Sequence, residues 1–277
     1  MSGGGKEGPA SQDKGPLLGR QVSGSEHYDP TLLFPVPRAT ARASLPGGRF
    51  RGCGEDIWHA YELNWLLPGG EPVMRLGVLS LSAETPYLVE SKSLKLYLQS
   101  LNQHPFPNDD AARRTIEADL GAVAGGPVSL ELHDVGSVAF AGVLAPGDSL
   151  DALAVAAPGE PREELLLPSG ETRLHCHTHR LRSLCPVTGQ PDWATVVIDC
   201  HGAAPTREGL LAYLLAFRAH REFHEQCVER IFSALMERVA PDFLSVHALY
   251  TRRGGLDISP WRCSEPRPAP RYRLDRQ

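Results

Sequence analysis

The order of hydrophobic periodicities repeats along this 277-residue chain, and the repeat constrains the fold more than any other feature. Alternating apolar and polar residues predict strands, whereas apolar residues three or four positions apart predict helices. Each half reads strand, strand, helix, helix, strand. Strands are expected at 56–65, 73–82, 128–133, 172–181, 194–200 and 244–250, and helices around 94–101 and at 109–123, 208–217 and 222–239. Two copies of one α+β unit explain the length better than a single large domain.

Composition sets the boundaries of the two units. Residues 1–25 are rich in Gly, Ser, Lys and Pro and predict a disordered tail. Residues 146–170 are rich in Pro, Asp, Glu and Gly and predict a linker. We therefore expect an N-terminal module at 26–145 and a C-terminal module at 171–277.

Charge and hydropathy limit the partners. The net charge is −5, whereas proteins that hold a polyanion are usually basic, so no nucleic-acid partner is expected. The sequence has no apolar run of about 18 residues and no apolar leader, so neither a membrane partner nor secretion is expected. The six cysteines lack C-x-x-C spacing and are expected to be reduced thiols in the cytoplasm. A small-molecule ligand is therefore favoured.

One loop combines a cysteine with a carboxylate. Cys185 and Asp192 lie between two predicted strands, in a segment that two prolines and a glycine make stiff. Cys185 is placed where it could act as a nucleophile. Asp192 could act as a proton donor if burial raises its pKa. The alternative is a small apolar loop residue followed by a turn aspartate.

Two predicted helix starts are candidate binding segments. Ser91 is expected to cap the first, where Lys92 and Lys95 lie one turn apart and suit a phosphate. The alternative is a solvated basic face. His224 and Glu225 begin the last helix, where a core histidine and an ordinary first-turn acid are the simpler interpretation.

A basic turn and a histidine row leave further alternatives open. Arg253 and Gly254 follow a strand, either as a phosphate-binding turn or merely as a basic turn, and no G-x-G-x-x-G joins a strand to a helix. His175, His177 and His179 share one face of a strand, as zinc ligands or as an exposed polar face. No closed set of four ligands is visible.

Four stretches together carry a resemblance to a known family. They are 90–98 (ESKSLKLYL), 185–193 (CPVTGQPDW), 223–231 (FHEQCVERI) and 250–261 (YTRRGGLDISPW). In this order they resemble the 7-cyano-7-deazaguanine reductases of the long bimodular QueF type, within the tunnelling-fold superfamily. The resemblance extends from about Asp29 to the end of the chain.

The resemblance implies a fold and an activity. The fold would be two tandem tunnelling-fold modules, each an antiparallel sheet backed by helices, in a homodimer whose sites lie where modules meet. The activity would be the NADPH-dependent reduction of 7-cyano-7-deazaguanine to its aminomethyl form in two hydride transfers, without a metal. The product would feed queuosine synthesis for tRNA, while the enzyme acts on the free base.

The resemblance also implies residue roles. Cys185 would form a covalent thioimide, Asp192 would donate a proton, and His224 would donate to the nitrogen or orient the imine. The substrate is expected to contact Val89, Glu90, Ser91, His224 and Glu225, and NADPH to contact Ser91, Lys92, Arg253 and Gly254.

Two rival functions and one side reaction stay open at this point. The rivals are a zinc hydrolase of the same fold resembling GTP cyclohydrolase I, and a purine- or pterin-binding protein that has lost catalysis. Cys227 follows His224 by three residues on one helix face, so a protective disulfide between Cys185 and Cys227 is a further hypothesis; the alternative is a small core residue.

Overall fold

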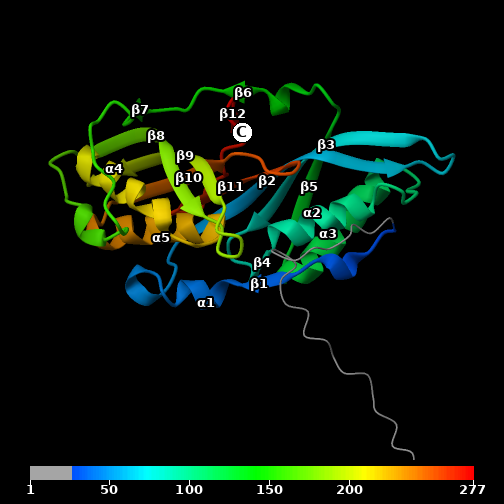
Figure 1. Ribbon diagram of the computed structural model, residues 1–277, viewed down its shortest axis with the longest axis horizontal. Coiled ribbons are helices and arrows are strands. Elements are labelled where there is room, and N and C mark those ends of the chain that lie inside the picture. Colours follow the sequence, from blue (N-terminus) through cyan, green and yellow to red (C-terminus); the bar gives the residue numbers. More distant parts are fainter. Residues whose placement is uncertain (1–26) are drawn as a thin grey trace, which may run out of the picture.

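The computed structural model describes residues 27–277, so the expected tail at 1–25 lies outside the described residues. Figure 1 shows a long sheet with helices on one side of it. Across residues 27–277, eight strands hydrogen-bond in the order β5 (Val128–His133), β3 (Pro72–Ser82), β2 (Cys53–Leu66), β11 (Leu256–Cys263), β10 (Phe243–Tyr250), β9 (Pro191–His201), β8 (Arg173–Leu184) and β7 (Asp148–Ser149). All neighbours are antiparallel except β7 and β8, which are parallel. The expected α+β class with an antiparallel sheet backed by helices is confirmed.

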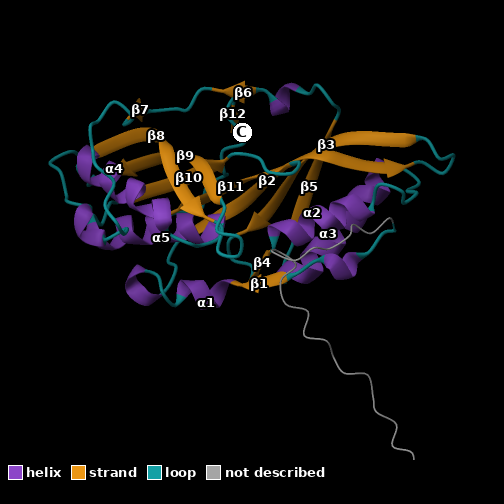
Figure 2. Cartoon of the chain, in the orientation of Figure 1, coloured by secondary structure: helices purple, strands orange, loops and turns teal. Residues whose placement is uncertain are grey.

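The helices cover the sheet in two groups, one for each half of the chain (Figure 2). The N-terminal group is α2 (Ser91–Ser100) and α3 (Asp109–Ala124), and the C-terminal group is α4 (Arg207–Leu215) and α5 (His224–Arg238). Each group buries its apolar face in a core of its own. Leu94 and Leu98 are buried under α2, and Ile231 and Leu235 under α5, as the helical spacing predicts.

The two half-sheets are continuous because β2 pairs with β11. Their register runs from Leu256 opposite Ala60 to Cys263 opposite Cys53. The strand β11 was not predicted from the sequence. Pro260 cannot donate to a ladder, and Asp257 and Arg262 are charged, so the segment lacks the pattern of a central strand. The structure accommodates the segment for two reasons. The ladder between β11 and β10 covers only residues 261–263, so Pro260 has no partner on that side, and both charged residues are paired.

Helix ends agree with the sequence at α3 and differ at α2. Asn108 caps α3 by accepting from the N–H of Ala111, and Gly125 ends it with φ of 74°. The expectation that Ser91 caps α2 is wrong. Glu90 is the N-cap, and its carboxylate accepts from the N–H groups of Lys92 and Ser93. A carboxylate at this position satisfies two amides that the helix leaves without partners.

The segment 146–170, expected as a linker, is packed against the C-terminal half. It contributes β7 to the sheet and a 3-10 turn, η4 (Glu163–Leu165). Leu150 and Leu166 are buried in the C-terminal core. Asp151 accepts from the hydroxyl of Thr178 and from the N–H of His179, at the register shift in β8.

The remaining elements connect and cover these parts. α1 (Arg38–Arg42) contacts α5, and β1 (Pro35–Pro37) pairs with β4 (Tyr87–Val89). β12 (Arg273–Leu274) pairs with β6 (Gly142–Val143) in a segment that Figure 1 shows on the sheet face away from the helices. The other 3-10 turns are η1 (Pro30–Leu32), η2 (Pro46–Gly48), η3 (Val138–Phe140) and η5 (Ala216–Ala219). Within residues 27–277, no helix has the length and apolar character that a membrane span requires.

Candidate active site

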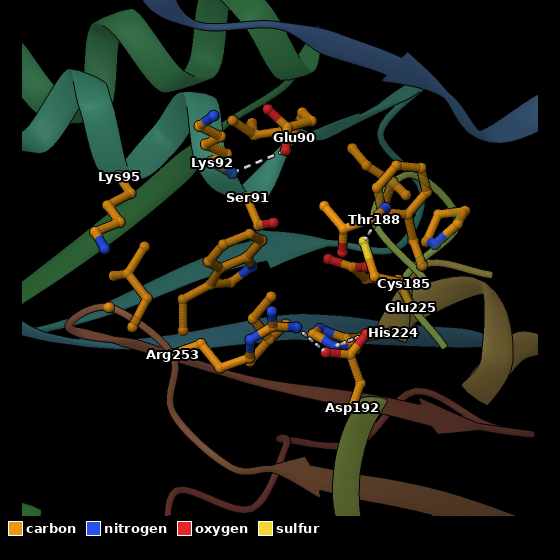
Figure 3. Close-up of a pocket in the computed structure, with 18 of the residues that line it drawn as sticks. Glu90, Ser91, Lys92, Lys95, Cys185, Thr188, Asp192, His224, Glu225 and Arg253 are labelled. Carbon is orange, nitrogen blue, oxygen red and sulfur yellow. Dashed lines mark hydrogen bonds and ion pairs between the residues drawn. The ribbon is translucent and has the colours of Figure 1, made fainter. Parts of the chain in front are cut away.

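A cavity of about 320 Å³ lies where the two halves of the sheet meet. Its floor includes Trp58 from β2 and Ile258 from β11. Its walls come from the end of β4 and the start of α2, from the β8–β9 loop, and from the start of α5 (Figure 3). The cavity brings together all the site residues that the sequence pointed to: Val89, Glu90, Ser91, Lys92, Cys185, Asp192, His224, Glu225, Arg253 and Gly254.

Cys185 sits in the tight loop that joins β8 to β9. Its N–H donates to the carbonyl of Gln190 at 2.9 Å, and its carbonyl accepts from Gly189 at 3.0 Å. Gly189 has φ of 68°, a conformation that other residues rarely adopt. The N–H of Thr188 points at the Cys185 sulfur at 3.5 Å, as Figure 3 shows. The loop thus holds the sulfur beside a backbone donor.

Asp192, on β9, is held between two cationic partners. Its Oδ2 lies 3.3 Å from His224 Nε2, and its Oδ1 accepts from Arg253 Nη1 at 2.5 Å. Burial raises the pKa of Asp192, but the hydrogen bonds and charges of His224 and Arg253 outweigh it, so the pKa lies below the usual aspartate value. The condition set for a proton donor, a pKa raised by burial, is therefore not met in this state, because the sequence did not reveal these two partners.

His224 is fixed by more than its carboxylate partner. Its ring lies against the ring of Tyr250, with centroids 3.9 Å apart and planes tilted by 30°. As the first residue of α5, it presents Nε2 to Asp192. The simpler interpretation of a core histidine does not hold, because its ring lines the cavity.

Two buried carboxyl groups also face the cavity. Glu90 has no exposed surface, and Glu225 is only 4% exposed. Burial raises the pKa of Glu90, although the N–H groups of Lys92 and Ser93 oppose the rise. Burial, and then the negative charge of Asp56, raise the pKa of Glu225 to about 7. Glu225 is therefore not the ordinary first-turn acid of the simpler interpretation.

The part of the cavity lined by α2 and by the turn after β10 is its basic end, with Lys92, Lys95 and Arg253. Figure 3 shows the two lysines on α2 and the Arg253 guanidinium directed at Asp192. Gly254 has φ of 59°, and a Cβ there would collide with the side chain of Lys95. The backbone of Gly254 and the Lys95 side chain thus form a close-fitting edge, where a phosphate group of a dinucleotide can approach the chain.

Lys95, which the sequence pairs with Lys92 as suited to a phosphate, also lines the cavity. Other lining residues were not predicted: Thr188 and Phe223 lie inside recognised stretches without having been singled out. Trp58 gave no signal, because in the sequence it is one of many alternating strand residues.

The histidine row lies away from the cavity. His177 Nδ1 is 2.9 Å from the carbonyl of Pro146, and His179 Nδ1 is 2.8 Å from Thr195 Oγ1. Over residues 27–277, no three His, Cys, Asp or Glu side chains are grouped so that they could hold a metal ion.

Cys227 is fully buried on α5, and burial raises the pKa of its thiol far above the usual range. A disulfide between Cys185 and Cys227 stays a prediction.

Comparisons with known proteins agree with this arrangement. Residues 25–132 match the family described as nitrile reductase, 7-cyano-7-deazaguanine-reductase N-term, and residues 191–269 match the family described as QueF-like protein. Cys185 lies between the two matched ranges.

Curated relatives cover almost the whole chain. Proteins named NADPH-dependent 7-cyano-7-deazaguanine reductase, from Xanthomonas campestris pv. campestris strains B100 and 8004, are each 48% identical over 260 residues. Each alignment spans 91% of this chain and 94% of the relative. At that identity and coverage, the chain belongs to the family of NADPH-dependent 7-cyano-7-deazaguanine reductases.

Proposed function

We propose that the chain is an NADPH-dependent nitrile reductase that converts 7-cyano-7-deazaguanine to 7-aminomethyl-7-deazaguanine for queuosine synthesis. The observation that carries this proposal is the content of one cavity. It holds a cysteine with a backbone donor at its sulfur, a carboxylate–imidazole pair, a buried carboxyl group and a basic end. The curated names of the relatives support the same activity.

Cys185 begins the reaction by adding to the nitrile carbon. A nitrile accepts hydride poorly, and addition of the thiolate converts it to a C=N thioimide that is a better acceptor. The carbon–sulfur bond forms, one C–N π bond breaks, and the nitrogen takes a proton. The rigid 185–190 loop holds the sulfur in place, with the N–H of Thr188 directed at it.

Asp192 and His224 deliver protons to the nitrogen of the substrate. Their side chains are paired at 3.3 Å, so a proton delivered to the substrate can come from either partner. In the described state Arg253 also binds Asp192 and stabilises its ionised form. When Arg253 turns toward a phosphate, Asp192 loses that cation, its pKa rises, and it becomes a better proton donor.

Glu225 and Glu90 select the base. A 7-deazaguanine ring presents N1–H and an amino group as adjacent donors, and a carboxylate accepts both. Glu225 faces the cavity, as does Val89 with its apolar side chain. Glu90 already accepts two backbone N–H groups, so it can contribute only its remaining lone pairs.

The basic end is suited to the cofactor. Ser91, Lys92, Arg253 and Gly254 would hold the phosphates, with Lys95 beside them. When bound there, NADPH supplies hydride, once to the thioimide and once to the imine that forms after Cys185 leaves. Water must be excluded from the site during the reaction, because a free imine would hydrolyse.

Oxidation of NADPH, followed by its absorbance with and without 7-cyano-7-deazaguanine, tests the proposed function. We expect two equivalents of NADPH to be consumed for each base, and no consumption without it. Binding of the base without any oxidation of NADPH would instead favour a binding protein. Cytoplasmic location and a homodimer remain predictions, and size measurement in solution tests the latter.

A further inference from the structure

A cluster of buried charges lies directly behind the cavity, and the proposed chemistry does not use it. Asp56 on β2 pairs with Arg38 Nη2 at 2.5 Å and with Arg262 Nη2 at 2.8 Å. Glu229 on α5 pairs with Arg42 at 2.7 Å and with Arg262 at 3.0 Å. These four elements, α1, β2, α5 and β11, come from both halves of the chain.

The geometry ties this cluster to the cavity. Asp56 lies two residues before Trp58 and therefore on the same face of β2, and Trp58 lines the cavity. Glu229 lies one helical turn after Glu225, so both carboxyl groups leave α5 on the same side. The cluster thus lies near Glu225, while Glu225 lines the cavity.

Glu225 forms no ion pair with the arginines of the cluster. Arg38, Arg42 and Arg262 are taken up by Asp56 and Glu229, and within residues 27–277 no ion pair forms with Glu225. Asp56 adds a like charge to its surroundings. A buried carboxyl group without a counter-ion and beside a like charge favours its neutral form.

Two other residues act in the opposite direction on the pKa of Glu225. His224, which opposes the rise in the pKa of Glu225, is already paired with Asp192. Arg38 opposes it as well, across the cluster. The other charged and titratable groups that line the cavity are Glu90, Lys92, Lys95, Cys185, Asp192, His224 and Arg253. Those on the elements packed against α5 include Arg38, Arg42, Glu163, Glu164, His247, Tyr250, Asp257 and Arg262, with Asp56 on β2 and Glu229 on α5 itself.

We propose that Asp56, fixed by Arg38 and Arg262, is a positioning residue for substrate recognition: its charge adds to the effect of burial and favours the protonated form of Glu225 until a purine-like base binds, so that binding releases a proton. The inference rests on the proposed function. The donor edge of the base replaces the missing counter-ion, and the carboxyl proton of Glu225 leaves to solvent as the two new hydrogen bonds form. A neutral carboxyl group would offer this edge a donor where an acceptor is needed.

Calorimetry on the full chain carrying Cys185→Ala tests the proton release, because this variant binds the base without forming the covalent bond. Titrations with 7-cyano-7-deazaguanine in two buffers of different ionisation heat count the protons. With the pKa of Glu225 near 7, we expect close to one proton released per base at pH about 6 and almost none above pH about 8. The Kd should rise about tenfold for each pH unit below 7.

Three variants in the same background assign the effect. The pH below which the Kd rises is called the break. Asp56→Asn should move this break to lower pH, because the negative charge near Glu225 is gone. Glu229→Gln is the matched control: it disturbs the same cluster but keeps Asp56, and its break should stay near that of the parent. Glu225→Gln should bind more weakly and show no dependence on pH in this range.

The outcomes separate this inference from the proposed function. If the base binds with no proton release and a flat Kd, the inference is overturned and the function stands. The same holds if the break survives in Glu225→Gln, or if Asp56→Asn and Glu229→Gln shift it equally. If the base does not bind at all, both fail. The calorimetry on the parent decides the proton release even if Asp56→Asn does not fold.

Discussion

At the scale of single residues, Asp192 is the group whose behaviour depends most on its neighbours. Burial raises the pKa of Asp192, whereas His224 and Arg253 lower it. The lowering is larger in the described state. A carboxylate in this position can position His224 and can exchange a proton with it. The exchange of a proton requires an ionisable oxygen.

Replacing Asp192 by Asn preserves the shape but removes the ionisable oxygen. We expect kcat to fall on the order of 10²-fold, as removal of a general acid typically does. Steady-state NADPH oxidation measures the change, and a circular dichroism spectrum like that of the wild type shows that the fold is intact. Turnover close to wild type would assign the proton transfer to His224 alone.

Arg253 is expected to serve both the cofactor and Asp192. Arg253→Ala should raise the KM for NADPH more than that for the nitrile, as should Lys92→Ala. Because Arg253 lowers the pKa of Asp192, and Asp192 must be protonated to donate, removal of Arg253 should also move the basic limb of the pH–rate profile to higher pH. Arg252→Ala is the control, since Arg252 is exposed and packs over Tyr61 outside the cavity. An effect confined to the nitrile term would place Arg253 at the base instead.

At the scale of elements, the turn after β10 shows how backbone shape makes a binding edge. Gly254 has a positive φ, and Lys95 from α2 occupies the space where a side chain would be. The turn and the helix start, far apart in the sequence, therefore form one surface of the cavity.

Gly254→Ala should raise the KM for NADPH severalfold, because the new methyl group displaces Lys95 and strains the turn. Strain at a positive φ costs about 1 kcal/mol of stability. Gly70→Ala is a suitable control, since its φ is 83° but no atom lies within 4 Å of the added Cβ. Equal effects of both variants on the KM would mean that strain alone is being measured.

The elements were predictable from the sequence where local patterns decide them, and less so where distant partners do. The leucines of α2, the Asn108 cap and the repeated order of strands and helices are local signals. β11 was missed because Pro260 and two charges break the strand pattern, and their compensation comes from His59, Asp56 and Glu229. Likewise, the site loop could be recognised, but the pairing of Asp192 with Arg253 depends on residues 61 positions apart.

At the scale of the whole molecule, the two halves are joined by the β2–β11 ladder and by the buried charge cluster beside it. Such clusters contribute little net stability compared with an apolar core, but losing one partner leaves buried charges without compensation. The cluster therefore makes the joint between the halves sensitive to the ionisation of Asp56.

Asp56→Asn should lower the free energy of unfolding by about 3 kcal/mol at neutral pH. Burial raises the pKa of Asp56, but Arg262 and Arg38 lower it further, so the net folded pKa is below the unfolded value. Its contribution is therefore present above the ordinary aspartate pKa and is lost as pH falls through the folded one. Urea unfolding of both proteins should show a difference that shrinks below pH about 4. A difference that is constant with pH would contradict this assignment.

The most direct test of the proposed chemistry is the intact mass of the protein after incubation with 7-cyano-7-deazaguanine and no NADPH. We predict a gain equal to the full mass of the nitrile compound, since addition of Cys185 expels nothing. The gain should be absent in Cys185→Ala and present in Cys227→Ala, which removes the other thiol on the α5 side. An unshifted mass at saturating base, or a gain that persists in Cys185→Ala, would contradict covalent catalysis by Cys185.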